Sequence, residues 1–478
     1  MSRSPCTRRK FMKVLGLGAA SLVVPGCSRE THRRTAGPVD RKPNIIFILA
    51  DDLGWAELGC YANTFNETPN LDRLARQGVR FTQAYSSAPV CSPYRASLMT
   101  GRYPARVGMT NYLQPDDNHW LSTDYLTIAE RLKSAGYATA VIGKWHLTGY
   151  AKRGVKEVTP DMHGFNETIV SENDGIGGGC YFHPYKFNTT IEKRLPGQEY
   201  LTDRQNLEAV EFIERHRHRP FFLYLSHYAV HTRLNGKAEL VRKYESRPRA
   251  GKGPGAERNN PHLAAQLESI DHGLGMIRQK LEQLGLEDNT IIIFTSDNGG
   301  ETRVTSNAPL RAGKSTLYEG GIRVPLIIFA PSVMPAGAVC ETPTCVIDFY
   351  PTLSQLAGLD RAATHHIDGL SILPLLKNPN ASLARDTLYW HYPLTKPHFL
   401  GGRSCSAIRK GNWKLLEFLD DGHLELYNLA EDIAETKDLA EELPGRARLL
   451  HQLLKQWRSS LESSVDAHAN QMKGYNTA

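Results

Sequence analysis

The stretch Asn44-Ile-Ile-Phe-Ile-Leu-Ala50 is an unbroken apolar run that leads directly into two carboxylates, Asp51-Asp52. Apolar runs without alternation are typical of strands covered on both faces, as in parallel sheets. Further runs of this kind follow it along the chain, over residues 138–142, 221–226, 290–296 and 324–330. The sequence therefore predicts a central sheet of buried, largely parallel strands.

Helical patterns separate these runs. Thr127-Ile-Ala-Glu130 has the residue types of a capping box and predicts a helix that ends near Gly136. Further helices are expected over residues 70–77, 203–216, 262–285 and 347–357. Strands alternating with helices predict an α/β fold, a large and mostly parallel sheet sandwiched by helices.

Two long segments do not fit this rhythm. Residues 160–200 are rich in Gly, Asn and aromatic residues, and residues 233–261 are basic and rich in Pro and Gly, which favours a mobile surface loop. From residue 386 onward, shorter patterns predict a small α+β domain with strands over 406–409, 413–418 and 424–428 and a closing helix over 443–460.

The first 27 residues have the composition of an export signal. Thr7-Arg8-Arg9-Lys10-Phe11 resembles a twin-arginine signal, and an apolar stretch too short to span a bilayer follows it. Val24-Pro25-Gly26-Cys27 resembles a lipoprotein cleavage box, with Cys27 as the lipidated residue, although Pro25 departs from the usual small residue. The alternative is a buried N-terminal helix. We expect a signal peptide over 1–27, a linker over 28–42, a main domain over 43–385 and a C-terminal subdomain over 386–478.

The net charge and the hydropathy of the sequence limit the classes of partner that this protein is expected to bind. The formal net charge of +7 falls to +2 once the five basic residues of the signal are set aside, which argues against a general nucleic-acid binder. No other apolar run is long enough to span a bilayer. We expect an exported bacterial protein, periplasmic or at the cell surface, whose only membrane contact is a lipid anchor at Cys27.

Oxygen-donor side chains follow two of the predicted strands. Asp51-Asp52 ends the first strand and Asp297-Asn298 ends the strand over 290–296. Adjacent carboxylates repel each other unless a cation lies between them, and carboxylate and amide oxygens suit Ca²⁺ or Mg²⁺ better than zinc. Each pair taken alone is better explained as an unrelated polar turn.

A candidate nucleophile and several cations come from other turns. Cys91 begins a helical run in Pro89-Val-Cys-Ser-Pro-Tyr-Arg95, so it would feel the positive end of a helix, with Arg95 one turn away. Further polar clusters contain Lys144, His146, His231 and Lys314. We expect all of these clusters at carboxyl ends of strands, where the active sites of such sheets are usually found. Taken singly, these residues have simpler interpretations: the cysteine as a buried small residue, the arginine as a surface residue, and the histidines as structural residues. Together with the oxygen donors they supply a cation site, a nucleophile, positive side chains and imidazoles, which are the groups needed to hydrolyse an anionic ester.

With these clusters in this order, the sequence resembles the formylglycine-dependent (type I) sulfatases of the alkaline phosphatase-like superfamily, which include arylsulfatases and glycan sulfatases. Residues 91–95 match the Cys-x-Pro-x-Arg motif that a formylglycine-generating maturation enzyme recognises in that family. The likeness runs from Lys42 to about Trp457 and includes Gly143-Lys-Trp-His-Leu147, Ser296-Asp-Asn-Gly-Gly300 and Tyr318-Glu-Gly-Gly-Ile-Arg-Val-Pro325.

The resemblance implies a sulfuric ester hydrolase in which Cys91 is oxidised to 3-oxoalanine (formylglycine). One Ca²⁺ would be held by Asp51, Asp52, Asp297, Asn298 and the modified Cys91. Arg95, Lys144 and His146 would orient and activate the aldehyde hydrate, while His231 and Lys314 would bind the sulfate and the leaving oxygen. The expected substrate is a sulfated small molecule or a carbohydrate O-sulfate.

A geminal diol explains why a modified residue is needed. One hydroxyl attacks sulfur to give a covalent enzyme-sulfate, and the other then expels sulfate by reforming the aldehyde. We assign His146 as the base for that expulsion and His231 as the acid for the departing alcohol.

Two residues depart from the family pattern: Tyr94 replaces a small residue, and Arg233 stands where many relatives carry proline. Tyr94 would alter the mouth of the pocket or the maturation of Cys91. Arg233 either contacts an anionic substrate or forms a surface salt bridge. Further candidate substrate contacts are the 160–200 segment and Tyr389-Trp390-His391-Tyr392.

Three alternatives stay open at this point. A phosphodiesterase or phosphonate monoesterase of the same superfamily can share the cysteine motif, and a catalytically inactive, carbohydrate-binding lipoprotein could keep the anion pocket alone. Cys340 and Cys345 either pair across a short loop or remain free thiols.

Overall fold

The computed structural model describes residues 42–115, 117–148, 158–173, 180–249, 259–359 and 366–475, with side chains as far as residue 461. The expected signal peptide over 1–27, its Cys27 and all but the last residue of the linker lie outside this part of the chain. Among the described residues, no helix is both long and apolar enough to cross a membrane.

A mixed sheet forms the centre of the molecule. Within the described residues it has nine strands, in the spatial order β4 (Glu167–Ile169), β3 (Ala138–Gly143), β5 (Phe221–Ser226), β1 (Asn44–Ala50), β6 (Thr290–Ser296), β7 (Arg323–Phe329), β2 (Val79–Tyr85) and β8 (Ala338–Cys340), with β9 (Thr344–Cys345) also paired to β2. All strands run parallel except β7, which is antiparallel to both of its neighbours. The predicted α/β fold with a mostly parallel sheet is confirmed.

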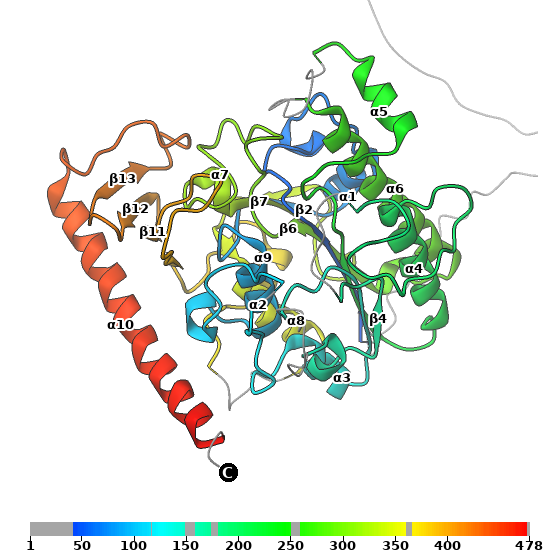
Figure 1. The fold of residues 1–478 in the computed structure, drawn as a ribbon, viewed down its shortest axis with the longest axis horizontal. Helices are drawn as coiled ribbons and strands as arrows, with labels where there is room; N and C mark the ends of the chain where they lie inside the picture. The colour runs from blue at the N-terminus through cyan, green and yellow to red at the C-terminus, as the bar shows by residue number, and fades with distance from the viewer. Residues whose placement is uncertain are drawn as a thin grey trace, which may run out of the picture. The chain divides into compact units, whose positions relative to one another are not determined.

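Helices cover both faces of this sheet, so each buried strand packs apolar side chains in both directions. Ile45, Phe47 and Leu49 of β1 join one apolar cluster, and Ile46 and Ile48 join the other. The first cluster includes residues of α2 (Cys91–Thr100), α3 (Ile128–Ser134), α8 (Phe349–Leu356) and α9 (Leu373–Lys377). The second includes residues of α1 (Pro69–Gln77), α4 (Leu201–Arg215) and α6 (Pro261–Gln283), on the other side of the sheet in Figure 1.

The predicted capping box is present at α3. The Thr127 hydroxyl accepts the Glu130 amide, while the Glu130 carboxylate accepts the Thr127 amide. This reciprocal pair satisfies two amides that a helix start otherwise leaves without partners.

The basic 233–261 segment is more ordered than predicted. It contains the helix α5 (Ala238–Glu245), whose Val241 and Tyr244 pack with Phe65 and with Ala264 and Ala265 of α6. Residues 250–258 lie outside the described part of the chain.

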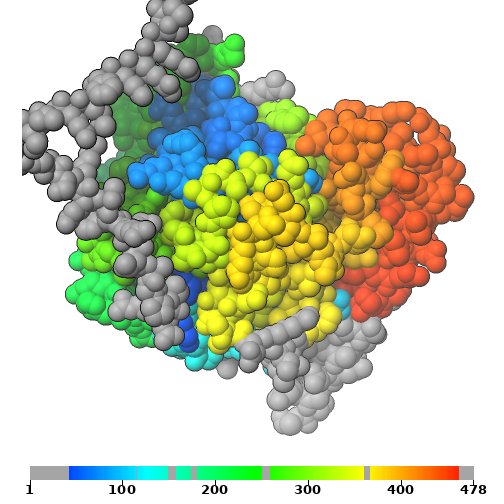
Figure 2. All heavy atoms as spheres, turned by 180° about the vertical axis from the view of Figure 1, so that it is seen from behind, coloured from blue at the N-terminus to red at the C-terminus, as the bar shows by residue number. Residues whose placement is uncertain are grey.

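A second, antiparallel sheet follows the central one in sequence. It consists of β10 (Thr387–Tyr392), β11 (Cys405–Lys410), β12 (Trp413–Phe418) and β13 (Leu424–Asn428). The final helix α10 (Pro444–Tyr475) packs on it through Ala447, Leu450 and Leu454, and is longer than predicted. In Figure 2 this part of the chain, coloured orange to red, lies beside the yellow segment that precedes it.

The two sheets are joined by buried polar contacts. The Trp390 indole of β10 donates to the Ser86 carbonyl at 2.7 Å. Lys414 of β12 forms ion pairs with Glu319 of the short helix α7 (Glu319–Ile322) at 2.9 Å and with Glu435 at 2.8 Å. The second sheet is thereby held close to α7, the short helix that precedes β7.

Candidate active site

The oxygen donors predicted from two separate strands come together at one edge of the sheet. β1 and β6 are parallel neighbours, with Ala50 opposite Ser296, so the residues that follow them meet. The Asp52 amide donates to Asp297 Oδ1 at 3.1 Å, and Asn298 Nδ2 donates to Asp52 Oδ1 at 2.8 Å. Gly299 is required behind them because a Cβ there would lie 1.7 Å from the Gly320 carbonyl oxygen.

This cluster fits a hard divalent cation. Ligand oxygens of Asp51, Asp52 and Asp297 lie within 4.8 Å of one another, and all three residues are buried. Asp51 Oδ1 and Asn298 Oδ1 are buried without a hydrogen-bond donor, an arrangement that costs free energy unless a cation supplies the missing partner. An all-oxygen donor set suits Ca²⁺ or Mg²⁺.

Cys91 and Arg95 enter the same cluster from α2. The helix begins at Cys91, which is buried, and the Ser86 hydroxyl donates to the Asp297 carbonyl at 2.7 Å, which ties the preceding loop to β6. Arg95 is fully buried and donates to Asp297 Oδ2 at 2.8 Å, to the Lys144 carbonyl at 2.8 Å and to Ser226 Oγ at 2.6 Å. Its guanidinium therefore connects three strands.

The two predicted lysines approach the carboxylates from opposite directions. Lys144 Nζ lies 2.5 Å from Asp51 Oδ2, and Lys314 Nζ lies 2.7 Å from Asp52 Oδ2. Burial opposes their charged forms, but the carboxylates outweigh it and raise the pKa of both ammonium groups, with Cys91 close enough to contribute in each case. Three buried cations thus balance three buried carboxylates, and a divalent ion would leave the site positive toward an anion.

The position of Lys314 corrects one expectation. Its cluster precedes β7, and β7 runs antiparallel to β6, so Lys314 reaches this edge of the sheet from the amino end of a strand. The sequence between two strands does not show their relative direction, which depends on pairing distant in sequence.

Both predicted histidines face the cluster, and both are held neutral by burial. Burial and the charge of Lys144 lower the pKa of His146 to about 3. Its Nε2 lies 2.9 Å from the Leu113 carbonyl, which can only accept, so Nε2 carries the proton and Nδ1 carries the lone pair. His231 Nε2 lies 3.8 Å from Asp52 Oδ2; burial and Lys314 lower its pKa well below the usual value, and Asp52 acts in the opposite direction.

Sequence reasoning missed Glu172, which shapes the turn that carries His146. The buried carboxylate accepts the backbone amides of Trp145 at 3.0 Å and His146 at 2.6 Å and the Tyr228 hydroxyl at 2.6 Å. His146 has a left-handed backbone, with φ of 54°, which side chains other than glycine adopt rarely. The three donors that converge on Glu172 hold this turn in place.

Other expected contacts lie elsewhere. Tyr94 is buried in the apolar cluster between sheet and helices, where it lines a small cavity of about 10 Å³. In the 389–392 segment, Trp390 and Tyr392 are buried, and Tyr389 stacks on Trp457 at 4.8 Å, so these aromatic residues mainly join the second sheet to its surroundings. Arg233 is exposed. Cys340 and Cys345 are buried free thiols.

Comparison with known proteins agrees with this geometry. Residues 43–359 match the family model "Sulfatase", and residues 312–462 match "N-sulphoglucosamine sulphohydrolase, C-terminal". A protein described as "Sulfatase" from Formosa agariphila is 32% identical over 92% of this chain and 91% of its own length. Arylsulfatase A from Homo sapiens is 32% identical over 90% and 89%, respectively.

Among solved structures, that of Ps i-CgsB superimposes with a TM-score of 0.75 at 32% identity, over 87% of this chain and 93% of that one. A second structure of Ps i-CgsB is a complex with k-i-k-neocarrahexaose, at the same identity and TM-score. The family model, the full-length relatives and the shared fold lead to one conclusion: this chain belongs to the sulfatase family and is a hydrolase of sulfate monoesters.

Proposed function

We propose that this sulfatase removes O-sulfate groups from carbohydrates, with Cys91 converted to formylglycine and one Ca²⁺ held by Asp51, Asp52, Asp297 and Asn298. The observation that carries the proposal is the pair of buried oxygens on Asp51 and Asn298 that accept no hydrogen bond, in a cluster that Cys91 adjoins at the start of α2. When bound, Ca²⁺ and the hydrated aldehyde would supply an acidified hydroxyl nucleophile.

The cations of the chain would then receive the sulfate. Lys314 and Lys144 carry fixed positive charges in a buried site, where such charges stabilise a developing anion far better than in water. Both terminal nitrogens of the Arg95 guanidinium donate within the cluster, to Asp297, to Ser226 and to the Lys144 carbonyl, so its proposed role is to hold the cluster together.

The two histidines suit opposite proton transfers. His146 is neutral with its lone pair on Nδ1, which suits a base. His231 lies beside Asp52, and the negative charge of a bound sulfate ester would favour the protonated ring further, which suits an acid at the leaving oxygen.

Two observations support a carbohydrate as the leaving group. Ps i-CgsB, 32% identical, has a solved complex with an oligosaccharide. The export signal predicted from residues 1–27, with the predicted lipobox at Cys27, would place the enzyme in the periplasm or on the cell surface, where it would meet sulfated glycans from the surroundings.

The test uses the full chain, produced in a host with a formylglycine-generating enzyme. Mass spectrometry of the peptide that bears residue 91 should show an aldehyde. Sulfated saccharides and nitrophenyl sulfate should be hydrolysed much faster than nitrophenyl phosphate. Cys91→Ala should abolish turnover, and Cys60→Ala, at a half-buried cysteine in another part of the molecule, should not. An unmodified thiol in the active enzyme, or faster phosphate hydrolysis, would reject the proposal.

A further inference from the structure

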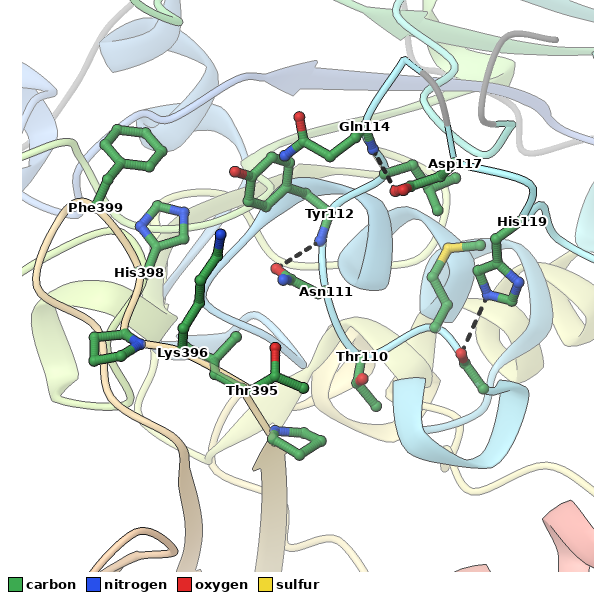
Figure 3. Close-up of a pocket in the computed structure, with 16 residues that line it drawn as sticks. Thr110, Asn111, Tyr112, Gln114, Asp117, His119, Thr395, Lys396, His398 and Phe399 are labelled. Carbon is green, nitrogen blue, oxygen red and sulfur yellow. Dashed lines mark hydrogen bonds between the residues drawn. The ribbon is translucent and has the colours of Figure 1, made fainter.

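A large cavity opens between two loops beside the catalytic cluster. It has a volume of about 960 Å³ and is lined by residues 108–114, 117 and 119 on one side and by residues 393–399, between β10 and β11, on the other. Small-molecule sites span roughly 300–1,000 Å³, so this cavity lies at the upper end of that range. Figure 3 shows polar and aromatic side chains from both loops facing it.

The first loop is tied directly to the catalytic residues. The Leu113 carbonyl contacts His146 Nε2 at 2.9 Å, and the Leu113 amide donates to the hydroxyl of Ser92, the residue after Cys91, at 3.0 Å. A group bound on this side of the cavity is therefore next to the reacting centre.

The second loop is pressed against the segment that carries Lys314. Gly402 packs so closely on the backbone of Ser315 that a Cβ at this position would lie 1.9 Å from the Ser315 carbonyl oxygen. His398 sits on this loop, and although burial chiefly lowers its pKa, to about 4, Lys314 and Asp52 are close enough to affect it. Both walls of the cavity thus meet the site where the sulfate would bind.

The wall of the second loop is aromatic. The His398 ring stacks on Phe399 with centroids 4.4 Å apart, and Tyr112 meets His398 edge-on at 5.5 Å from across the cavity. Phe399 is 68% exposed, which is unusual for such a large apolar side chain. Exposed aromatic surface beside hydroxyl and amide groups suits a sugar, which has an apolar face and a polar rim.

The charge of Lys396 favours an additional anion on the second-loop side of the cavity. Among the described residues, Lys396 has no carboxylate within ion-pair distance, and its side chain points toward Tyr112 and His398 in Figure 3. The Asp117 carboxylate also lines the cavity and keeps its negative charge, but it accepts the backbone amide of Gln114 at 2.6 Å, which holds it on its own loop. Arg303, which stacks on Phe399, is paired with Glu301. Among the described residues that line the cavity, Lys396 is therefore the cation whose charge no ion pair neutralises.

Resting on the proposed function, we propose that this cavity binds the saccharide next to the hydrolysed sulfate ester, and that Lys396 selects substrates whose neighbouring sugar carries a second anionic group. That group is a carboxylate or a further sulfate. Tyr112 and Phe399 hold the sugar ring, and Lys396 sets the preference for charge.

The experiment measures inhibition of nitrophenyl sulfate hydrolysis by a panel of disaccharides. One set is monosulfated with a neutral neighbouring sugar, one is monosulfated with a uronic acid, and one is disulfated. The wild-type enzyme should bind one or both of the doubly anionic sets more tightly than the neutral set, and the better set identifies the second anion as carboxylate or sulfate.

Lys396→Ala should weaken inhibition by the preferred set about tenfold or more, as expected for loss of a charge-assisted contact. It should leave the neutral set and the kinetics of nitrophenyl sulfate nearly unchanged. Lys396→Arg should retain most of the preference. Lys377→Ala, at an exposed lysine that does not line the cavity, should change nothing.

The outcomes separate the two proposals. If the wild-type enzyme hydrolyses no sulfate ester, the proposed function fails. If it hydrolyses nitrophenyl sulfate but binds doubly anionic disaccharides no better than neutral ones, or if Lys396→Ala weakens all sets equally, this inference is overturned while the proposed function stands.

Discussion

Glu172 illustrates how one buried carboxylate can hold the backbone of a residue proposed to act in catalysis, here His146. Its carboxylate accepts two backbone amides from the turn where His146 has a left-handed backbone, and it also accepts a tyrosine hydroxyl from another segment. An ionised carboxylate has hydrogen-bond acceptors and no donor, unlike a side-chain amide, so three donors can converge on it without a clash between donors.

Replacing Glu172 with Gln should therefore disturb catalysis more than substrate binding. The added amide donor faces N–H and O–H donors, and the His146 turn shifts. A misplacement of about 1 Å can cost on the order of 10²-fold in rate, so kcat should fall by about 10- to 100-fold with KM little changed. Steady-state kinetics on nitrophenyl sulfate measures this.

Glu199 provides a matched control. It is buried and also accepts two backbone amides and a tyrosine hydroxyl, from Arg194, Leu195 and Tyr185. Glu199→Gln should lower the melting temperature without a comparable loss of kcat. Equal losses of kcat in the two variants would reduce Glu172 to a general structural role.

His231→Ala tests the proposed acid. Positioned proton transfer contributes roughly 10²–10⁴-fold, but a good leaving group needs little protonation. The loss of kcat/KM should therefore be larger for an alkyl or saccharide sulfate than for nitrophenyl sulfate. Equal losses on both substrates would show that His231 binds sulfate without donating a proton.

At the level of secondary-structure elements, sequence patterns were informative where burial was complete. β1, β3, β5 and β6 are continuous apolar runs, and the structure buries every residue in them, so their strands were predicted closely. β2, Val79-Arg-Phe-Thr-Gln-Ala-Tyr85, has polar residues in its middle and was missed. The direction of β7 could not be predicted, because it depends on partners far away in sequence.

The loop between β10 and β11 offers a test of how the second sheet contributes to the site. Gly402→Ala should force the loop away from Ser315, since the new Cβ would overlap the Ser315 carbonyl oxygen. Inhibition by disaccharides should weaken, and the kinetics of nitrophenyl sulfate should change less. Gly401→Ala is the control: its φ of 91° costs about 1 kcal/mol of strain, but nothing lies within 4 Å of the added Cβ. Similar effects of both variants would contradict a specific contact.

The buried cluster that joins the second sheet to α7 should give stability a pH dependence. Lys414 faces two glutamates, and burial together with the charge of Glu319 raises the pKa of Glu435 from its usual 4.5 to about 7, against the opposing effect of Lys414. Between these values the unfolded carboxyl is ionised while the folded one keeps its proton. Stability from this group is therefore lost as pH rises from about 4.5 to about 7.

Glu435→Gln should remove that part of the pH dependence, because the amide oxygen can still accept from Lys414 and does not ionise. Melting temperatures at pH 5 and pH 8 should differ less in the variant than in the wild type. Asp420→Asn, at an exposed carboxylate paired with Arg403, is the control and should leave the pH difference as it was. If the variant shows the same difference in melting temperature as the wild type, the pH dependence of stability comes from other groups.

For the whole molecule, the sequence predicted which turns meet but not everything that supports them. Four clusters come together because parallel strands end at a common edge of the sheet, which is a property of the fold. They are the clusters at 51–52, 91–95, 144–146 and 297–298. Glu172 and the 393–399 loop come from irregular segments. Such segments carry no periodicity from which a position in space could be inferred.

The cation site links this convergence to the stability of the whole chain. Asp51, Asp52 and Asp297 are buried, and ligand oxygens of the three lie within 4.8 Å of one another. Asp51 Oδ1 and Asn298 Oδ1 accept no hydrogen bond, and Asp51 Oδ1 lies 3.9 Å from the Arg95 guanidinium. An ion that binds only the folded state stabilises it by about 2.7 kcal/mol when its free concentration is one hundred times its dissociation constant. Removing Ca²⁺ with a chelator should thus lower the melting temperature by several degrees and abolish turnover, and added Ca²⁺ should restore both.

The identity of the ion and of its ligands can be tested in the same measurement. Mg²⁺ requires near-ideal octahedral geometry and gives up water reluctantly, so it should restore the melting temperature less well than Ca²⁺. Asp51→Asn should remove most of the Ca²⁺-induced rise, whereas Asp271→Asn, at a buried carboxylate that accepts the Asn70 and Leu71 amides, should retain it. If chelation and Ca²⁺ leave the melting temperature unchanged, the three carboxylates are neutralised by Arg95, Lys144 and Lys314 alone, and sulfate binding would depend on those side chains without a metal ion.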